Sequence, residues 1–389
     1  MNLRLLTAGE SHGPAMTAIL EGMPAGLALD AALIDRELAR RQQGLGSGAR
    51  MHIEHDQVKI LSGVLAGQTT GAPIALLVEN ADHANWKGKP VAAMIAPRPG
   101  HADLTGALKY GFNDLRPALE RASARETNMR VAAGAICKHF LAQFGILVGG
   151  FVRAIGGVSL EGAVSDYEAC FRAAEASALR CPDEDVAAQM RARIEQALEE
   201  KDTLGGVVEI VALNLPVGLG SYVQGDQRLG ARLAGALASV PSVRGVEFGD
   251  GFAAAGLRGT QAQDSFRLEA GRLRRASNRA GGIEGGISNG EPLVLRAALK
   301  PIASTLAPQP TVDLAAGVET QTSYVRSDFC HVPRAVPVLE AVTAFVLADA
   351  LLEKLGGDTL PELQVRFAVL RKAQLADLSL DTSDKVWWA

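Results

Sequence analysis

The sequence predicts an α+β fold in one large domain, residues 1–389, in which sheets pack against a layer of helices. Two observations lead to this class. Strand-like and helical segments do not alternate regularly, as they would in a doubly wound sheet, and the glycine motifs lie in long irregular segments. With 48% hydrophobic residues the chain can bury a sizeable core, and no clear repeat or linker divides it.

Four segments are rich in Val, Ile and Leu with flanking Gly or Pro, which predicts strands. They are Val58–Val64, Pro73–Glu79, Ile146–Ile155 and Val207–Leu215. Helical patterns occupy Asp30–Arg41, Ala118–Phe144 and Val336–Leu355. The last two are apolar on most faces, so we expect them to be buried between other layers.

The stretch Asp183–Glu200 has a different pattern, which predicts an amphipathic helix at the surface. Val186, Met190, Ile194 and Leu198 recur every four residues, and acidic residues occupy the first turn. We also expect an insertion at 163–187 and a loosely ordered tail at 377–389.

Composition and charge narrow the function classes. A formal net charge of −4 argues against a broadly basic nucleic-acid binder, so local arginine clusters indicate a focused anion pocket. The four cysteines form neither a CxxC pair nor a disulfide-like framework, and we expect no metal site, because His52 and His55 would point to opposite faces of an extended segment. Without a recognisable signal peptide or membrane span, a cytoplasmic protein that binds neither membrane nor nucleic acid is expected.

The segment GESHG, residues 9–13, matches the G-x-S-x-G pattern of a hydrolase nucleophile elbow. An elbow, however, lies well inside the chain after several strands, whereas this segment lies near the first residue. A glycine turn with a partly buried histidine is the simpler alternative. A third interpretation is that His12 lies close to a ligand and delivers a proton, since its pKa is near neutrality in model peptides.

Two further segments combine glycines with basic residues. Arg40, Arg41 and Arg50 flank GLGSG (44–48), which is either a phosphate-binding loop or a solvated basic loop. In APRPGHAD, prolines stiffen the chain on both sides of Arg98, and Gly100 allows a tight turn before His101. This segment is either a rigid mount for two functional side chains or a structural turn.

In ERASARE, Arg121 and Arg125 would stack on one face of a helix, which is unfavourable unless an anion neutralises them. Glu120 and Glu126 could do so in a plain solvated helix. The glycine pairs at 281–282 and 285–286 suit close approach to a phosphate or a planar ring.

Near the start of the last long helical pattern, Arg326 and Asp328 share one face of an extended segment. The two side chains therefore either act on one ligand or form a surface ion pair with each other.

Taken together, six collinear motifs resemble those of the chorismate synthase family, and the similarity continues through GGDTLPE at 356–362. The motifs are GESHG (9–13), RPGHAD (98–103), ERASARETNMRVAAGA (120–135), SNRAGGIEGG (277–286), KPIAST (300–305) and RSDFC (326–330).

The resemblance implies a lyase of the shikimate pathway, the route to the aromatic amino acids. Such an enzyme converts 5-enolpyruvylshikimate 3-phosphate to chorismate and phosphate by 1,4-anti elimination, and it requires reduced FMN without net redox change. The resemblance also implies a homotetramer and a β-α-β sandwich with helices between antiparallel sheets.

Site residues follow from the resemblance position by position. It implies acid roles for His12 and His101, toward flavin and leaving group, and a role for Asp328, with flavin N5, in removing the ring proton. Residues implied to bind substrate are Ser11, Arg41, Arg50, Arg98, Arg125 and Arg326. Residues implied to contact FMN are Arg121, Ala122, Ser123, Pro241, Ser242, Gly285, Lys300, Pro301, Ile302, Ala303, Ser304 and Arg326.

One position departs from the family pattern. Many bacterial members have an arginine six residues beyond Arg41, assigned to NADP or substrate anions, where this chain has Ser47. This puts a nicotinamide contact of Arg41 and Ser47 in doubt. NADPH as an indirect reductant and an external flavin reductase therefore remain alternatives, because no reductase domain is recognisable. A flavin- or nucleotide-binding protein without catalysis is the competing function, but His12, His101 and Asp328 together argue against it.

Overall fold

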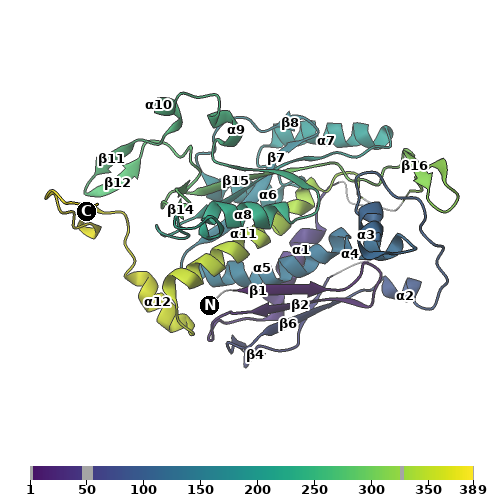
Figure 1. The fold of residues 1–389 in the computed structure, drawn as a ribbon, viewed down its shortest axis with the longest axis horizontal. Helices are drawn as coiled ribbons and strands as arrows, with labels where there is room; N and C mark the ends of the chain where they lie inside the picture. The colour runs from purple at the N-terminus through teal and green to yellow at the C-terminus, as the bar shows by residue number, and fades with distance from the viewer. Residues whose placement is uncertain (1–2, 46–55, 325–327, 389) are drawn as a thin grey trace.

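The computed structural model describes residues 3–45, 56–324 and 328–388. Two antiparallel sheets enclose a layer of helices, as Figure 1 shows with β1, β2 and β6 below α5 and α11 and with β7 and β15 above them. The first sheet has the order β1 (Arg4–Ala8), β2 (Ala15–Glu21), β6 (Ile74–Glu79), β3 (Val58–Ile60). The second has the order β10 (Val243–Phe248), β15 (Leu293–Leu299), β9 (Gly206–Leu213), β7 (Leu147–Ile155), β8 (Val158–Ser159). The predicted fold class is confirmed.

The strands of the first sheet bury one face. In β6, Ile74, Leu76 and Val78 are buried and alternate with less buried residues, as a sheet packed on one side requires. The predicted strand Val58–Val64 is divided, because Gly63 has φ +81° and turns the chain. Beyond this turn lies a hairpin of β4 (Val64–Leu65) and β5 (Gln68–Thr69).

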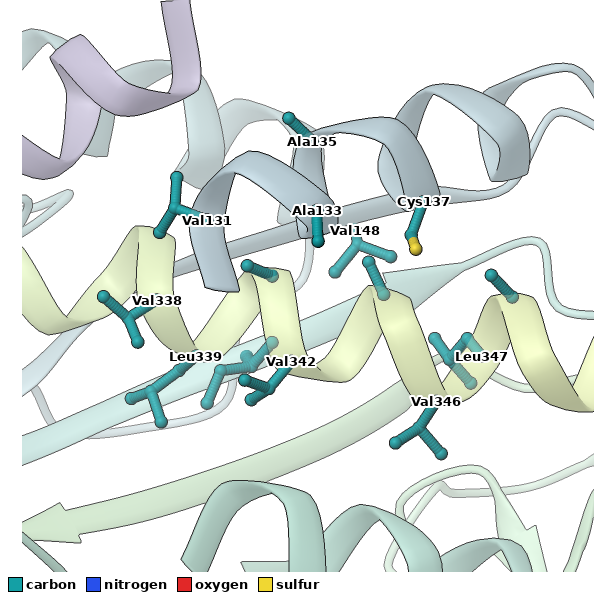
Figure 2. Close-up of a cluster of buried hydrophobic side chains, with 14 of the residues drawn as sticks. Val131, Ala133, Ala135, Cys137, Val148, Val338, Leu339, Val342, Val346 and Leu347 are labelled. Carbon is teal, nitrogen blue, oxygen red and sulfur yellow. The ribbon is translucent and has the colours of Figure 1, made fainter. Parts of the chain in front are cut away.

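The helical layer is built on α1 (Ala31–Gln42), α5 (Thr127–Ala142) and α11 (Val332–Leu355), with α8 (Leu229–Ala238) beside α11. Helices α5 and α11 pack closely (Figure 2). A Cβ at Gly134 would lie 2.3 Å from the Cβ of Ala341, so only glycine allows this approach. Both helices are buried on most faces, as their apolar sequences predict.

Helix α11 is long and apolar enough to cross a membrane, but 89% of its most apolar window is buried inside the protein. It lies between the two sheets rather than at the surface (Figure 1). Its hydrophobicity is therefore accounted for by the core.

The predicted helix Ala118–Phe144 is wrong as a single element. It consists of α4 (Arg116–Arg121), a 3₁₀ turn at Ala124–Glu126 and α5. The break lies at Ser123, whose backbone is extended and whose side chain accepts a hydrogen bond from the N–H of Arg125. The expected stacking of Arg121 and Arg125 on one helix face is therefore wrong as well.

The predicted surface helix is confirmed as α7 (Glu184–Glu199), capped by Asp183. Met190 and Ile194 are buried, whereas Leu198 is exposed. The remaining helices are α2 (His83–Trp86), α3 (Asp103–Tyr110), α6 (Tyr167–Ala176), α9 (Gly251–Ala254), α10 (Gly259–Ala262) and α12 (Leu360–Ala368). The remaining hairpins pair β11 (Phe266–Glu269) with β12 (Arg272–Arg275), β13 (Ile283–Glu284) with β14 (Ile287–Ser288), and β16 (Pro310–Asp313) with β17 (Val318–Gln321).

Several short elements gather at one end of the sandwich. Helices α2, α3 and α4 and the β16–β17 hairpin lie at the right in Figure 1. The hairpin is tied to the segment before α3, because Thr311 Oγ1 donates to the carbonyl of Pro97 at 2.6 Å and Leu314 N donates to that of Ile95 at 3.1 Å. His12, which contacts Trp86 of α2 and Glu120 of α4, and His101, just before α3, lie at this end.

Candidate active site

The segment GESHG forms the turn between β1 and β2. Gly9 has φ +121°, and a Cβ there would lie 2.7 Å from the carbonyl oxygen of Ala15. The turn holds His12 against α4: the backbone N–H of His12 donates to Glu120 Oε2 at 2.9 Å, and Nδ1 lies 2.7 Å from Oε1. The imidazole also packs on Trp86, with 4.0 Å between ring centroids. His12 is thus held by two contacts with Glu120 and one with Trp86.

Ser11 faces a different partner. Its Oγ accepts a hydrogen bond from Ser123 Oγ at 3.1 Å, and its N–H donates to the carbonyl of Glu120. Among the described contacts, none joins Ser11 to His12. The segment also connects two antiparallel strands rather than a strand to a helix, so it is not a nucleophile elbow. The Ser hydrolase interpretation is therefore disfavoured.

Glu120 is the carboxylate that holds His12. Burial alone would raise its pKa, but the hydrogen bonds from the ring and backbone of His12 outweigh burial and lower it. Arg116 contributes more weakly, with 3.9 Å between Nη1 and Oε1. Glu120 is therefore an ionised acceptor that holds the ring and the backbone N–H of His12.

A second histidine lies on a carboxylate of its own. His101 Nδ1 is 2.6 Å from Oδ1 of Asp103, which is wholly buried. Arg98 donates two hydrogen bonds to the same carboxylate, from Nε at 2.8 Å and from Nη2 at 2.9 Å. Burial would raise the pKa of Asp103, but the hydrogen bonds from Arg98 and His101 outweigh it and hold the pKa far below its usual value. The rigid-mount interpretation of this segment is therefore favoured over a simple turn.

The segment Lys300–Ser304 closes over this second group. Arg98 Nη1 donates to Ser304 Oγ at 3.2 Å, and the Lys300 ammonium donates to the carbonyl of Gly100. The backbone N–H of Lys300 donates to the carbonyl of Ser242 at 2.9 Å. Burial, together with the nearby Arg244, lowers the pKa of Lys300. A partly desolvated ammonium beside a second cation is suited to an anionic ligand.

A third group surrounds the end of α1. Arg41 Nη2 donates to Asp56 Oδ2 at 2.8 Å, and Arg125 Nη2 lies 3.5 Å from Oδ1 of the same buried carboxylate. Asp328 pairs with Arg334 in the first turn of α11. Arg334 Nε in turn donates to the carbonyl of Arg41 at 3.2 Å. Two candidate substrate ligands and the candidate proton acceptor are thus linked.

His331, which the sequence does not single out, lies beside this third group. Both ring nitrogens are sealed from solvent, and neither has a hydrogen-bond partner among the described residues. Burial lowers the pKa of His331 to about 4, and although the charge of Asp328 opposes this shift, the charges of Arg334 and Lys300 add to it. His331 is therefore neutral near pH 7.

Packing connects the three groups. Ser123, bonded to Ser11, precedes Arg125 of the third group and accepts from its N–H at 3.3 Å. Helix α3, which begins at Asp103, packs on α4 so closely that a Cβ at Gly106 would lie 2.7 Å from the Cβ of Ala118. Motifs far apart in the sequence therefore form one region.

Some predicted residues lie elsewhere or outside the described part of the chain. Gly285 lies in the turn between β13 and β14, and no backbone hydrogen bond among the described residues joins it to the three groups. Ala122 ends α4, and Pro241 precedes Ser242, which has φ +77°. Ser47, Arg50, Arg326, His52 and His55 lie outside the described residues.

The hydrogen-bond partners of the carboxylates Glu120 and Glu126 do not follow from the sequence motifs. The sequence offers Glu120 and Glu126 as neutralisers of Arg121 and Arg125, but Glu120 binds His12, and Glu126 binds Thr7 and Arg130. Arg121 instead donates to the carbonyl and hydroxyl of Thr7. Only Asp103 could have been found locally, because it follows His101 by two residues.

Comparison with known proteins decides the family. The chorismate synthase family profile matches residues 3–352. A chorismate synthase of Symbiobacterium thermophilum is 50% identical over 376 residues, covering 92% of this chain and 96% of the relative. One of Pelobacter propionicus is 50% identical over 379 residues, covering 93% and 96%. The chain belongs to the chorismate synthase family.

A crystal structure of chorismate synthase agrees, with a TM-score of 0.77 at 42% identity over 95% of this chain and 97% of the other. As a member of this family, the protein is a lyase. The resemblance that the motifs indicate is confirmed over nearly the whole chain.

Proposed function

We propose that this lyase converts 5-enolpyruvylshikimate 3-phosphate to chorismate and phosphate by 1,4-anti elimination, the last common step of the shikimate pathway. One observation carries the proposal: two histidines, each held through Nδ1 on an ionised carboxylate, lie in a region lined by arginines. Loss of phosphate requires a proton donor or a cation at the leaving oxygen, and this arrangement supplies both.

His12 and His101 are the acids of the proposed reaction. A carboxylate at Nδ1 orients an imidazole and stabilises its protonated form, so that the opposite side of the ring can serve a ligand. Glu120 does this for His12 and Asp103 for His101. Asp328 takes part in the other half of the elimination, the removal of the ring proton. Ser11 donates a hydrogen bond to the substrate.

The substrate carries a phosphate and two carboxylates, which call for several fixed guanidinium groups. Arg41 and Arg125 are held by Asp56, and Arg98 is held by Asp103. Because their carboxylate partners fix these side chains before binding, little ordering cost falls on the substrate complex. Arg50 and Arg326 complete the proposed set of substrate ligands.

FMN is the proposed cofactor, and the residues present fit it. A partly desolvated Lys300, held on a carbonyl and close to Arg244, suits a phosphate-bearing ligand. The proposed contacts are Arg121, Ala122, Ser123, Pro241, Ser242, Gly285, Lys300 to Ser304 and Arg326. Reduced FMN supplies an electron-rich ring that supports cleavage of the allylic C–O bond.

The source of reduced flavin, the assembly and the compartment complete the proposal. NADPH as an indirect reductant and an external flavin reductase are both compatible with it, although Ser47 stands where many members have arginine. We also propose a homotetramer in the cytoplasm.

An anaerobic assay tests the proposal. The protein is mixed with chemically reduced FMN and 5-enolpyruvylshikimate 3-phosphate, and phosphate release and chorismate absorbance are followed together. We expect both products in equal amounts, and none with oxidised FMN under the same conditions. Absence of product with reduced FMN present would contradict the proposed reaction.

A further inference from the structure

Arg334 joins two parts of the candidate site that lie far apart in the sequence. Its Nη1 donates to Oδ2 of Asp328, six residues earlier, and its Nε donates at 3.2 Å to the carbonyl of Arg41, 293 residues earlier. One planar guanidinium group therefore contacts both the candidate proton acceptor and the end of the helix that carries a candidate substrate ligand.

The surroundings restrict Arg334 to this position. The side chains of Arg334 and Asp328 are each only 15% exposed. The chain that follows α1 packs on the aliphatic part of Arg334, since a Cβ at Gly44 would lie 3.3 Å from its Cγ and 3.3 Å from Cβ of Pro333. Gly44 has φ +141°, so a side chain there would be strained even without this contact.

The end of α1 is a suitable partner for a cation. The last carbonyl groups of a helix carry partial negative charge and lack partners within the helix. Arg180 Nη2 donates to the carbonyl of Arg40 at 2.9 Å, and Arg334 donates to the next one, that of Arg41. Both arginines cap α1, but only Arg334 also holds a carboxylate with a proposed part in the reaction.

The geometry points to Arg334 as a positioning residue that sets Asp328 in register with Arg41. This inference rests on the proposed function, because it assumes that Asp328 serves proton removal and Arg41 binds substrate. Arg334 orients the carboxylate with one nitrogen and the helix end with another. A lysine has a single terminal nitrogen, which cannot occupy the positions of Nε and Nη1 at once.

Kinetics of two variants test the inference with reduced FMN supplied. Arg334→Ala is expected to lower kcat about 100-fold, the order of loss that a misplaced catalytic group causes. Arg334→Lys can still pair with Asp328 but not also with the Arg41 carbonyl. It is therefore expected to recover much of kcat while KM for 5-enolpyruvylshikimate 3-phosphate rises several-fold.

A double-mutant cycle with Asp328→Asn separates positioning from general damage. If Arg334 acts through Asp328, adding Arg334→Ala to Asp328→Asn lowers kcat little further. Two independent losses that multiply would overturn the inference, as would wild-type kcat in Arg334→Ala.

A matched control is an arginine of α8 that pairs with the same helix, α11. Arg232 pairs with Asp349 of α11, and its side chain is 19% exposed, similar to Arg334, but it contacts none of the three groups in the described residues. Arg232→Ala is expected to keep kcat and KM while losing comparable thermal stability. If it lowers kcat as much as Arg334→Ala, the effect reflects destabilisation of α11, and the inference fails.

Failure of the inference and failure of the proposed function give different results. Full kcat in Asp328→Asn would contradict the proposed part of Asp328, and the inference with it. An inactive Asp328→Asn beside a fully active Arg334→Ala would overturn the inference alone. If Arg334→Ala does not fold, Arg334→Lys still decides through the separate changes in kcat and KM.

Discussion

The regions of His12 and His101 share one feature, a carboxylate at Nδ1 of the histidine, but differ in what surrounds it. Each imidazole lies with Nδ1 on a carboxylate oxygen, at 2.7 Å in the first region and 2.6 Å in the second. Glu120 comes from another element, 108 residues away, and serves mainly the histidine. Asp103 follows His101 by two residues, is wholly buried and also binds Arg98.

This difference indicates two ways to fix a histidine. The His101 region is a local unit in which Arg98 and His101 compete for one buried carboxylate, so that changes to either affect the other. The His12 region is assembled from the β1–β2 turn and α4, and Trp86 supplies packing where Arg98 supplies charge in the other region. The His101 region depends on buried charge and the His12 region on tertiary packing.

The largest expected effect is on turnover. His12→Ala and His101→Ala are each expected to lower kcat at least about 100-fold, because each removes a proposed general acid. Flavin binding should be retained, since other residues provide its proposed contacts. Stopped-flow measurement of chorismate formation with reduced FMN checks this, and normal turnover in either variant would restrict the acid role to the other histidine.

Neutralising Asp103 should lower the free energy of unfolding more than neutralising Glu120. Asp103→Asn leaves Arg98, whose side chain is only 9% exposed, without its anion and is expected to cost about 3 kcal/mol. Glu120→Gln, with less burial and no tightly bound arginine, is expected to cost about 1 kcal/mol. Urea unfolding of both variants measures this difference. Equal losses would contradict the distinction between buried charge and packing.

The pH dependence of stability sharpens the same comparison. Because the pKa of Asp103 is lowered on folding, its contribution is fully present above its unfolded value of about 3.9 and is lost as pH falls through the lower folded value. The difference in unfolding free energy between wild type and Asp103→Asn should be constant from pH 7 to about 5 and shrink below about pH 4. Urea titrations at these pH values test the sign; a difference that grows on acidification would refute it.

The smallest effect is expected at Ser11. Ser11→Ala removes the hydrogen bond from Ser123 and should cost about 1 kcal/mol or less. Because no described contact joins Ser11 to the His101 region, Asp103→Asn should add its full cost in the double variant. Non-additive unfolding energies would show that the two regions are coupled more tightly than their contacts indicate.

Much of the fold follows from local pattern. The long apolar segments predict buried helices, and α5 and α11 lie between the sheets because they have no polar face to present to water. The Val, Ile and Leu content of Pro73–Glu79 predicts the strand β6, whereas the structure shows which of its faces is buried. The break at Ser123 is not evident from the sequence, because one extended residue whose hydroxyl accepts from the N–H of Arg125 leaves no mark on an otherwise helical composition.

The candidate site divides in the same way. His101, Arg98 and Asp103 lie within six consecutive residues, and the motif that contains them holds its own geometry because proline and glycine limit the backbone. The partnership of His12 with Glu120 and the bridge from Asp328 through Arg334 to Arg41 depend on how β1, α4, α1 and α11 pack. Residue types and local spacing therefore specify the chemistry that the chain carries, whereas contacts between distant segments depend on the burial of the common core and exist only after it has formed.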